Sequence, residues 1–125
     1  MGEKVANYDL KIIQGSDTCD LVFVVTTDDG NPVNLTGYTA RLQIRPNVNS
    51  DELFDDLSTE NDRIILESFV EDGQTFWRVT CKFPHLVTTD YSFLKGVYDL
   101  ELYKEGKVYR YLEGIVEVNK EVTRQ

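Results

Sequence analysis

Apolar and polar residues alternate along most of the chain, with a repeat of two residues rather than 3.6. A repeat of two places successive side chains on opposite faces of an extended strand, so it predicts β-structure. The pattern predicts seven strands, at residues 8–13, 19–25, 38–45, 63–69, 75–83, 97–103 and 108–118. Strands of this number and length predict an all-β fold, a single immunoglobulin-like β-sandwich of about seven antiparallel strands. A small closed barrel is the alternative.

Three connections between the predicted strands carry the residues of tight turns. Residues 28–32 read Asp-Asp-Gly-Asn-Pro, residues 71–74 read Glu-Asp-Gly-Gln, and residues 104–107 read Lys-Glu-Gly-Lys. Glycine tolerates the left-handed backbone that short hairpin loops require, so each sequence predicts a turn.

Two segments depart from the alternation. Residues 46–62 are irregular, and their few apolar residues predict a long excursion held by a small number of core contacts. Residues 84–94 also break the pattern, and Thr88, Thr89 and Asp90 lie in the middle of this segment. Such side chains accept hydrogen bonds from the first N–H groups of a helix, so we expect a short helical turn to begin there.

The alternation also predicts which side chains form the core. The residues on the predicted apolar faces are Tyr8, Leu10, Ile12, Cys19, Leu21, Phe23, Val25, Tyr38, Ala40, Leu42, Ile44, Ile64, Leu66, Trp77, Val79, Cys81, Phe83, Tyr98, Leu100, Leu102, Leu112, Val116 and Val118. Trp77 is the largest of them and is expected to fill space between the two sheets. Phe76, Arg78, Thr80 and Lys82 are predicted to face outward.

The length of 125 residues is that of one domain. We expect an N-terminal arm at residues 1–7, a sandwich domain at residues 8–118 and a C-terminal tail at residues 119–125. The 13 Lys and Arg against 22 Asp and Glu give a net charge of −9, which argues against nucleic acid as a partner. Residues 51–56 form the densest acidic stretch and are expected to be a solvated loop.

Membrane insertion and export are not expected. No apolar stretch reaches the roughly 20 residues that a membrane-spanning helix needs. The first residues also lack the apolar segment of a signal peptide, so we expect a protein made in the cytosol and kept there or assembled from it. Cys19 and Cys81 should then be reduced, as small buried side chains, although a disulfide between facing sheets stays open as an alternative.

The sequence offers no recognisable catalytic set. His85 is the only histidine, and neither a nucleophile motif nor a phosphate-binding motif accompanies it. We therefore expect a non-enzymatic protein with no catalytic residue, cofactor or metal. Asp28, Asp29 and Asn31 have some character of a calcium loop, but they lack the alternating ligands and closing glutamate of an EF-hand.

The last predicted strand carries the strongest candidate for a contact surface. Tyr109, Tyr111 and Ile115 alternate with the apolar positions that are predicted to face the core. Tyrosine is enriched where proteins meet, so the three residues are a candidate protein interface. Burial of both faces of the strand within the molecule is the alternative.

Several stretches resemble small virion proteins of tailed bacteriophages. These stretches are residues 8–15, 29–45, 96–102, 110–114 and 121–124. They are similar to the immunoglobulin-like N-terminal domain of phage baseplate upper proteins and to short accessory proteins of the tail. The motifs are strand and turn patterns, and the resemblance supplies no active-site residue.

The resemblance implies a structural protein of the phage tail, baseplate or neck, found in the virion and assembled in the host cytoplasm. Its partners would be other phage structural proteins, with multiple copies in a symmetric assembly. A capsid decoration protein is an alternative within the same class. A carbohydrate- or calcium-binding module that recognises the host surface is the alternative from another class.

Overall fold

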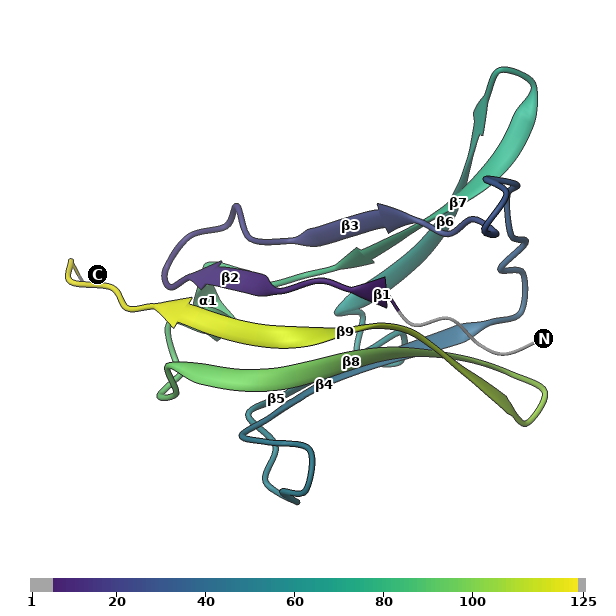
Figure 1. The fold of residues 1–125 in the computed structure, drawn as a ribbon. Helices are drawn as coiled ribbons and strands as arrows, with labels where there is room; N and C mark the ends of the chain where they lie inside the picture. Colours follow the sequence, from purple (N-terminus) through teal and green to yellow (C-terminus); the bar gives the residue numbers. More distant parts are fainter. Residues whose placement is uncertain (1–5, 124–125) are drawn as a thin grey trace.

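The computed structural model describes residues 6–123, which form two β-sheets packed as a sandwich, together with one short helix (Figure 1). The larger sheet contains β1 (Ala6–Asn7), β2 (Leu10–Ile13), β4 (Thr39–Arg45), β5 (Asp55–Ser58), β8 (Lys95–Lys104) and β9 (Lys107–Asn119). The smaller sheet contains β3 (Leu21–Val24), β6 (Ile64–Glu71) and β7 (Gln74–Cys81), and the helix is α1 (His85–Thr88). Strands are ordered β1-β9-β8-β4-β5 in the larger sheet, where β2 also pairs with β9, and β3-β7-β6 in the smaller. The predicted all-β fold with two packed sheets is confirmed.

The prediction of antiparallel pairing throughout is wrong, because β1 and β2 both run parallel to β9. Leu10 lies beside Val116 and Ile12 beside Val118, and all four side chains are buried. No tight turn joins the first strand to the last, so the direction of the first strand is not fixed by a hairpin. Parallel pairing here still directs the apolar residues of both strands to the core.

Strand β5 was not predicted, since it lies in the segment interpreted as irregular. It pairs with β4 at the edge of the larger sheet, and its Leu57 is fully buried. Leu57 is the only apolar residue among the four residues of β5, and one apolar position gives no alternation to detect.

The helical turn exists, but it ends where it was predicted to begin. Helix α1 starts at His85 after Pro84, and the N–H groups of Val87 and Thr88 donate to the Pro84 carbonyl at 3.0 and 3.1 Å. Thr88 is the last residue of the helix and is fully buried. Its hydroxyl accepts a hydrogen bond from the Gly15 N–H at 3.2 Å, so it binds the chain after β2 rather than capping a helix.

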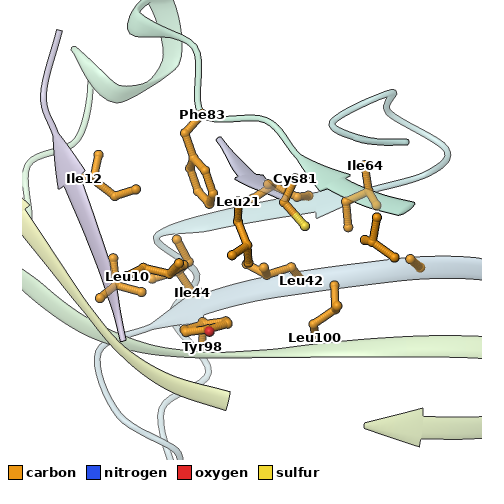
Figure 2. Close-up of a cluster of buried hydrophobic side chains, with 14 of the residues drawn as sticks. Leu10, Ile12, Leu21, Leu42, Ile44, Ile64, Cys81, Phe83, Tyr98 and Leu100 are labelled. Carbon is orange, nitrogen blue, oxygen red and sulfur yellow. The ribbon is translucent and has the colours of Figure 1, made fainter. Parts of the chain in front are cut away.

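The core lies between the sheets and is built from the alternating apolar residues (Figure 2). Leu42, Ile44 and Leu100 of the larger sheet are fully buried, and Ile64 and Cys81 face them from the smaller sheet. Burying one such aliphatic side chain stabilises a fold by about 1.5–3 kcal/mol. Trp77 and Phe23, predicted to be inward, are only partly buried against this core.

Tyr8 was predicted to face the core but is 54% exposed. It lies between β1 and β2, where the chain crosses closely over Gly114 of β9. A Cβ atom on Gly114 would lie 2.3 Å from the Tyr8 carbonyl oxygen. That oxygen accepts a hydrogen bond from the Tyr98 hydroxyl at 2.5 Å, and the Asp9 carboxylate accepts one from the Ile115 N–H at 3.0 Å. The Asp9 side chain thus replaces a backbone pairing, and the Tyr8 ring is turned outward.

Parts of the predicted N-terminal arm and C-terminal tail belong to strands of the larger sheet. Ala6–Asn7 belongs to the predicted N-terminal arm but forms β1, and Asn119 of the predicted tail lies in β9. Beyond β9, the Glu121 N–H donates to the Gln14 side chain at 2.9 Å. Residues 1–5 of the arm and 124–125 of the tail lie outside the described residues.

Candidate interaction surface

Tyr109, Tyr111 and Ile115 do not form a row on one face, because a β-bulge interrupts β9. Leu112 pairs with Leu100, whereas Arg110 pairs with the next residue, Glu101, which leaves Tyr111 as the additional residue. Tyr109 is opposite the buried Leu102 and therefore lies on the core side, with its ring centre 6.3 Å from that of Tyr38.

Beyond the bulge, the alternation of β9 is shifted by one residue. Ile115 is opposite Val97 and lies on the outer side, 41% exposed. Tyr111 packs in part against the core. The bulge therefore divides the predicted interface residues between two faces of the larger sheet.

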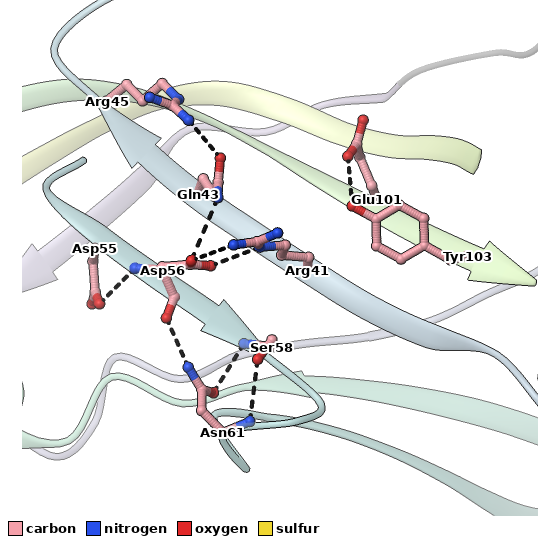
Figure 3. Close-up of polar contacts among 9 residues, drawn as sticks. All are labelled: Arg41, Gln43, Arg45, Asp55, Asp56, Ser58, Asn61, Glu101 and Tyr103. Atoms are coloured by element: carbon pink, nitrogen blue, oxygen red, sulfur yellow. Dashed lines mark hydrogen bonds and ion pairs between the residues drawn. The ribbon is translucent and has the colours of Figure 1, made fainter. Parts of the chain in front are cut away.

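The outer face of the larger sheet is polar and charged (Figure 3). Arg41 of β4 binds Asp56 of β5 through two hydrogen bonds, of 3.1 and 2.7 Å. Arg45 donates to the Gln43 side chain at 2.9 Å, and the Tyr103 hydroxyl donates to Glu101 at 3.1 Å. Side chains of one strand thus pair with their neighbours along and across the sheet.

A shallow groove of about 390 Å³ on this face brings several charges together. Burial raises the pKa of Asp99, and the nearby Glu101 and Glu113 raise it further, while Arg110 opposes the shift. Arg110 lies 3.8 Å from Asp99 and 3.2 Å from Glu113. The opposite charges of the groove contact one another, which is typical of a sheet face turned to water.

The outer face of the smaller sheet has a different composition. Four cross-strand pairs cover β6 and β7 on this side, namely Ile65 with Thr80, Glu67 with Arg78, Phe69 with Phe76, and Glu71 with Gln74. Two valines of β3 continue the same surface beside Thr80 and Arg78. We name this surface the hairpin face and define it by ten residues: Val22, Val24, Ile65, Glu67, Phe69, Glu71, Gln74, Phe76, Arg78 and Thr80.

The side chains of the hairpin face hold one another in place while remaining accessible. The rings of Phe69 and Phe76 are stacked with centres 5.8 Å apart. The Arg78 guanidinium lies 4.4 Å from the centre of the Phe69 ring and 3.1 Å from the Glu67 carboxylate. Val22, on the edge strand β3, is 52% exposed and extends the apolar part of the face. A fixed apolar and aromatic surface of this kind loses little side-chain entropy on binding.

The β6–β7 hairpin extends past the end of β3, and Figure 1 shows it projecting from one end of the sandwich. Strand β3 pairs only with Arg78–Cys81 of β7, so Phe76 and its partner Phe69 lie on the projecting part. Trp77 lies on the opposite side of the hairpin and is partly buried against the core. The hairpin face therefore continues from the body of the sandwich onto a projecting arm.

A buried polar cluster joins the two sheets at the base of this hairpin. Arg63 donates to the two Asp55 oxygens at 3.2 and 2.9 Å, and the Tyr91 hydroxyl donates to the same carboxylate. Burial opposes the charge on Arg63, but the interaction with Asp55 outweighs it and raises the pKa of the guanidinium. Burial also raises the pKa of Tyr91, together with its hydrogen bond to Asp55. Asp55 thus serves the packing of the sandwich, although it belongs to a stretch predicted to be a solvated loop.

The cysteines are both free thiols in the structure, so the disulfide alternative is excluded there. Cys81 is buried, and burial raises its pKa to about 12. The Cys19 sulfur accepts a hydrogen bond from the Ile13 N–H at 3.2 Å. Cys81 is the small buried side chain that was predicted, whereas Cys19 is only partly buried.

The remaining candidates lie in loops. His85 contacts the Asp17 carboxylate at 2.9 Å, and hydrogen bonds from His85 lower the pKa of Asp17, first among them the bond from the backbone N–H. Gly30 closes the turn after β3 with φ of 83°, and its N–H donates to the Thr27 carbonyl. Within residues 6–123, no three His, Cys, Asp or Glu side chains gather as metal ligands do.

Sequence comparisons give this chain no relatives: no known protein family and no curated protein matches it. Among the described residues, no helix is long and apolar enough to cross a membrane.

Proposed function

We propose that the chain is a non-enzymatic structural module of a bacteriophage particle, an assembly or adaptor protein of the tail, baseplate or neck. The observation that carries the proposal is the contrast between its two outer surfaces. The larger sheet presents paired charges to the solvent, while the hairpin face presents valines, phenylalanines and an arginine. Aromatic residues and arginine are enriched in protein interfaces, so the hairpin face is suited to bind protein.

Several features support the phage context. The strand and turn patterns of residues 8–45 and 75–124 resemble those of small virion proteins. We classify the sandwich as immunoglobulin-like, since two sheets of short strands within about 100 residues are typical of that group. Modules of this kind act in many copies, where small contacts gain strength from repetition. In this proposal the partners are other structural proteins of the particle, and the protein resides in the virion after assembly in the host cytoplasm.

The proposal is tested by isolating particles from cells that produce the phage. Gradient-purified particles should contain the chain in multiple copies, as measured by quantitative mass spectrometry. A Val22→Glu variant should be lost from the particles, because a charge interrupts the hairpin face. Val108→Glu is the matched control, since Val108 is also a strand valine with 52% exposure but lies outside this face.

Absence of the wild-type chain from purified particles would contradict the proposal. Equal incorporation of the Val22→Glu and Val108→Glu variants would agree with a role in the particle. It would show, however, that the hairpin face is not the surface that binds the other particle proteins. Circular dichroism of each purified variant establishes that the sandwich has folded.

A further inference from the structure

We infer that the hairpin face binds a second copy of this chain in a two-fold, face-to-face contact. This inference rests on the proposed function, because it names the partner of the same surface in a multi-copy assembly. Three observations carry it: the distribution of charge, the complementarity of the cross-strand pairs and the size of the surface.

The distribution of charge selects the partner. The chain carries a net charge of −9, so two copies repel each other over most of their surfaces. Glu67 and Arg78 at the centre of the hairpin face cancel each other's charge, and Glu71 adds one negative charge at its end. A strongly basic partner would be attracted to the acidic parts of the molecule rather than to this face. Another acidic copy can approach here with less like-charge repulsion than over the rest of the molecule, and the two-fold axis places Glu71 over the uncharged Gln74 of the other copy.

The cross-strand pairs are complementary to themselves. A two-fold axis that runs along the strands between β6 and β7 exchanges the two members of each pair. It places Glu67 of one copy over Arg78 of the other, and Phe69 over the second copy's Phe76. An axis along β7 itself would instead place two Arg78 side chains against each other. The first arrangement is a self-complementary contact of the kind that two-fold dimers require.

The size of the surface predicts a weak contact. About this axis β3 lies outside the overlap, because β6 is an edge strand of the smaller sheet. The overlapping β6 and β7, about 4.8 Å apart and eight residues long, cover an area of roughly 250 Å². Stable interfaces bury about 800 Å² on each partner. We therefore expect a dissociation constant of roughly 0.1–1 mM for two isolated copies, and a firm contact only where an assembly holds many copies together.

The experiment is sedimentation velocity of the full chain from about 10 µM to 1 mM. The wild type should show a concentration-dependent monomer–dimer equilibrium. Arg78→Glu and Glu67→Arg should each reduce self-association by at least roughly tenfold, since each places like charges across the axis. An equimolar mixture of these two variants should form a heterodimer more tightly than either variant alone. Val108→Glu should behave as the wild type.

A wild-type chain that stays monomeric at about 1 mM would overturn the inference, and so would a mixture that does not associate. A dimer that the Arg78→Glu variant retains would also overturn it, because the contact would then use another surface. Phe76→Ser provides a second, uncharged disruption of the face. The particle assay separates the two proposals: a monomeric chain found in particles removes only the self-contact, and a dimer absent from particles removes only the phage role.

Discussion

Substitution of Gly114 by alanine tests the close crossing of the N-terminal strands over β9. Gly114 does not have a left-handed φ, so its backbone conformation is open to any residue. Glycine is needed there because a side chain has no space. The new Cβ would lie 2.3 Å from the Tyr8 carbonyl oxygen, and contacts under 3.0 Å force the neighbouring backbone to move. Three hydrogen bonds of 2.9, 2.5 and 3.0 Å depend on this crossing: Tyr8 N–H to Glu113, Tyr98 hydroxyl to Tyr8, and Ile115 N–H to Asp9.

The magnitude follows from these bonds. Each contributes about 0.5–1.5 kcal/mol to stability, so their loss removes about 2–4 kcal/mol. Alanine is better than glycine in a strand by about 0.5–1 kcal/mol, which offsets part of the loss. We expect Gly114→Ala to lower the free energy of unfolding by about 1–3 kcal/mol. The midpoint of urea unfolding, followed by the fluorescence of Trp77, should then fall by about 1 M.

The control is a double-mutant cycle with a chain that lacks residues 1–9. The shortened chain has no Tyr8 carbonyl, so Gly114→Ala should have little effect or a slightly stabilising one in that background. An equal loss of stability in both backgrounds would refute the assignment of the effect to the crossing. An unchanged midpoint in the full chain would show that β1 and β2 do not cross β9 at this position.

Three further outcomes follow from the buried groups. Arg63→Ala should lower the free energy of unfolding by about 3–5 kcal/mol in urea titrations, because it leaves Asp55 buried without its partner; a loss under about 1 kcal/mol would contradict a buried role for the pair. Burial raises the pKa of Cys81 to about 12 and that of Tyr91 above its usual value, so the folded state holds both protons more tightly than the unfolded chain. The contribution of these two groups to stability should therefore be constant below about pH 9 and fall as the pH rises further, by about 2 kcal/mol at pH 10.5 for the thiol alone. Cys81→Ala should make this alkaline fall shallower. In a thiol-titration assay Cys19 should react in the native protein and Cys81 only after unfolding; equal rates would contradict the burial of Cys81.

The alternation of apolar residues was sufficient to predict the strands that face a shared core. Strands such as β4 and β8 carry three or four apolar residues at a spacing of two, and burial of these residues determines their orientation. The parallel direction of β2 was not predictable, because alternation is the same for both directions and no turn connects it to β9. Leu57 in β5 gave too little signal on its own.

The prediction that Tyr109, Tyr111 and Ile115 share one face was wrong for a similar reason. A period of two assumes unbroken pairing, and the bulge at Tyr111 reverses the alternation beyond it. The outward direction of Phe76 and Arg78 was predicted correctly from the same rule. What the sequence did not indicate was that Phe69 lies beside Phe76, since this depends on the register set by the turn at residues 71–74.

The pairing of β2 with β9 has a consequence for how the chain folds. Leu10 and Val116 are neighbours in space but 106 residues apart in sequence. Closing a loop of that length costs about 3 kcal/mol more in chain entropy than closing a short hairpin. This cost is smaller once the intervening strands have folded, so β2 is expected to pair with β9 after the rest of the sheet has formed. We expect β2 to dock last and to open first, with the fastest amide hydrogen exchange among the paired strands of the core. During synthesis the larger sheet cannot close until β9 has left the ribosome, so the unpaired side of β8 stays open to other chains until then.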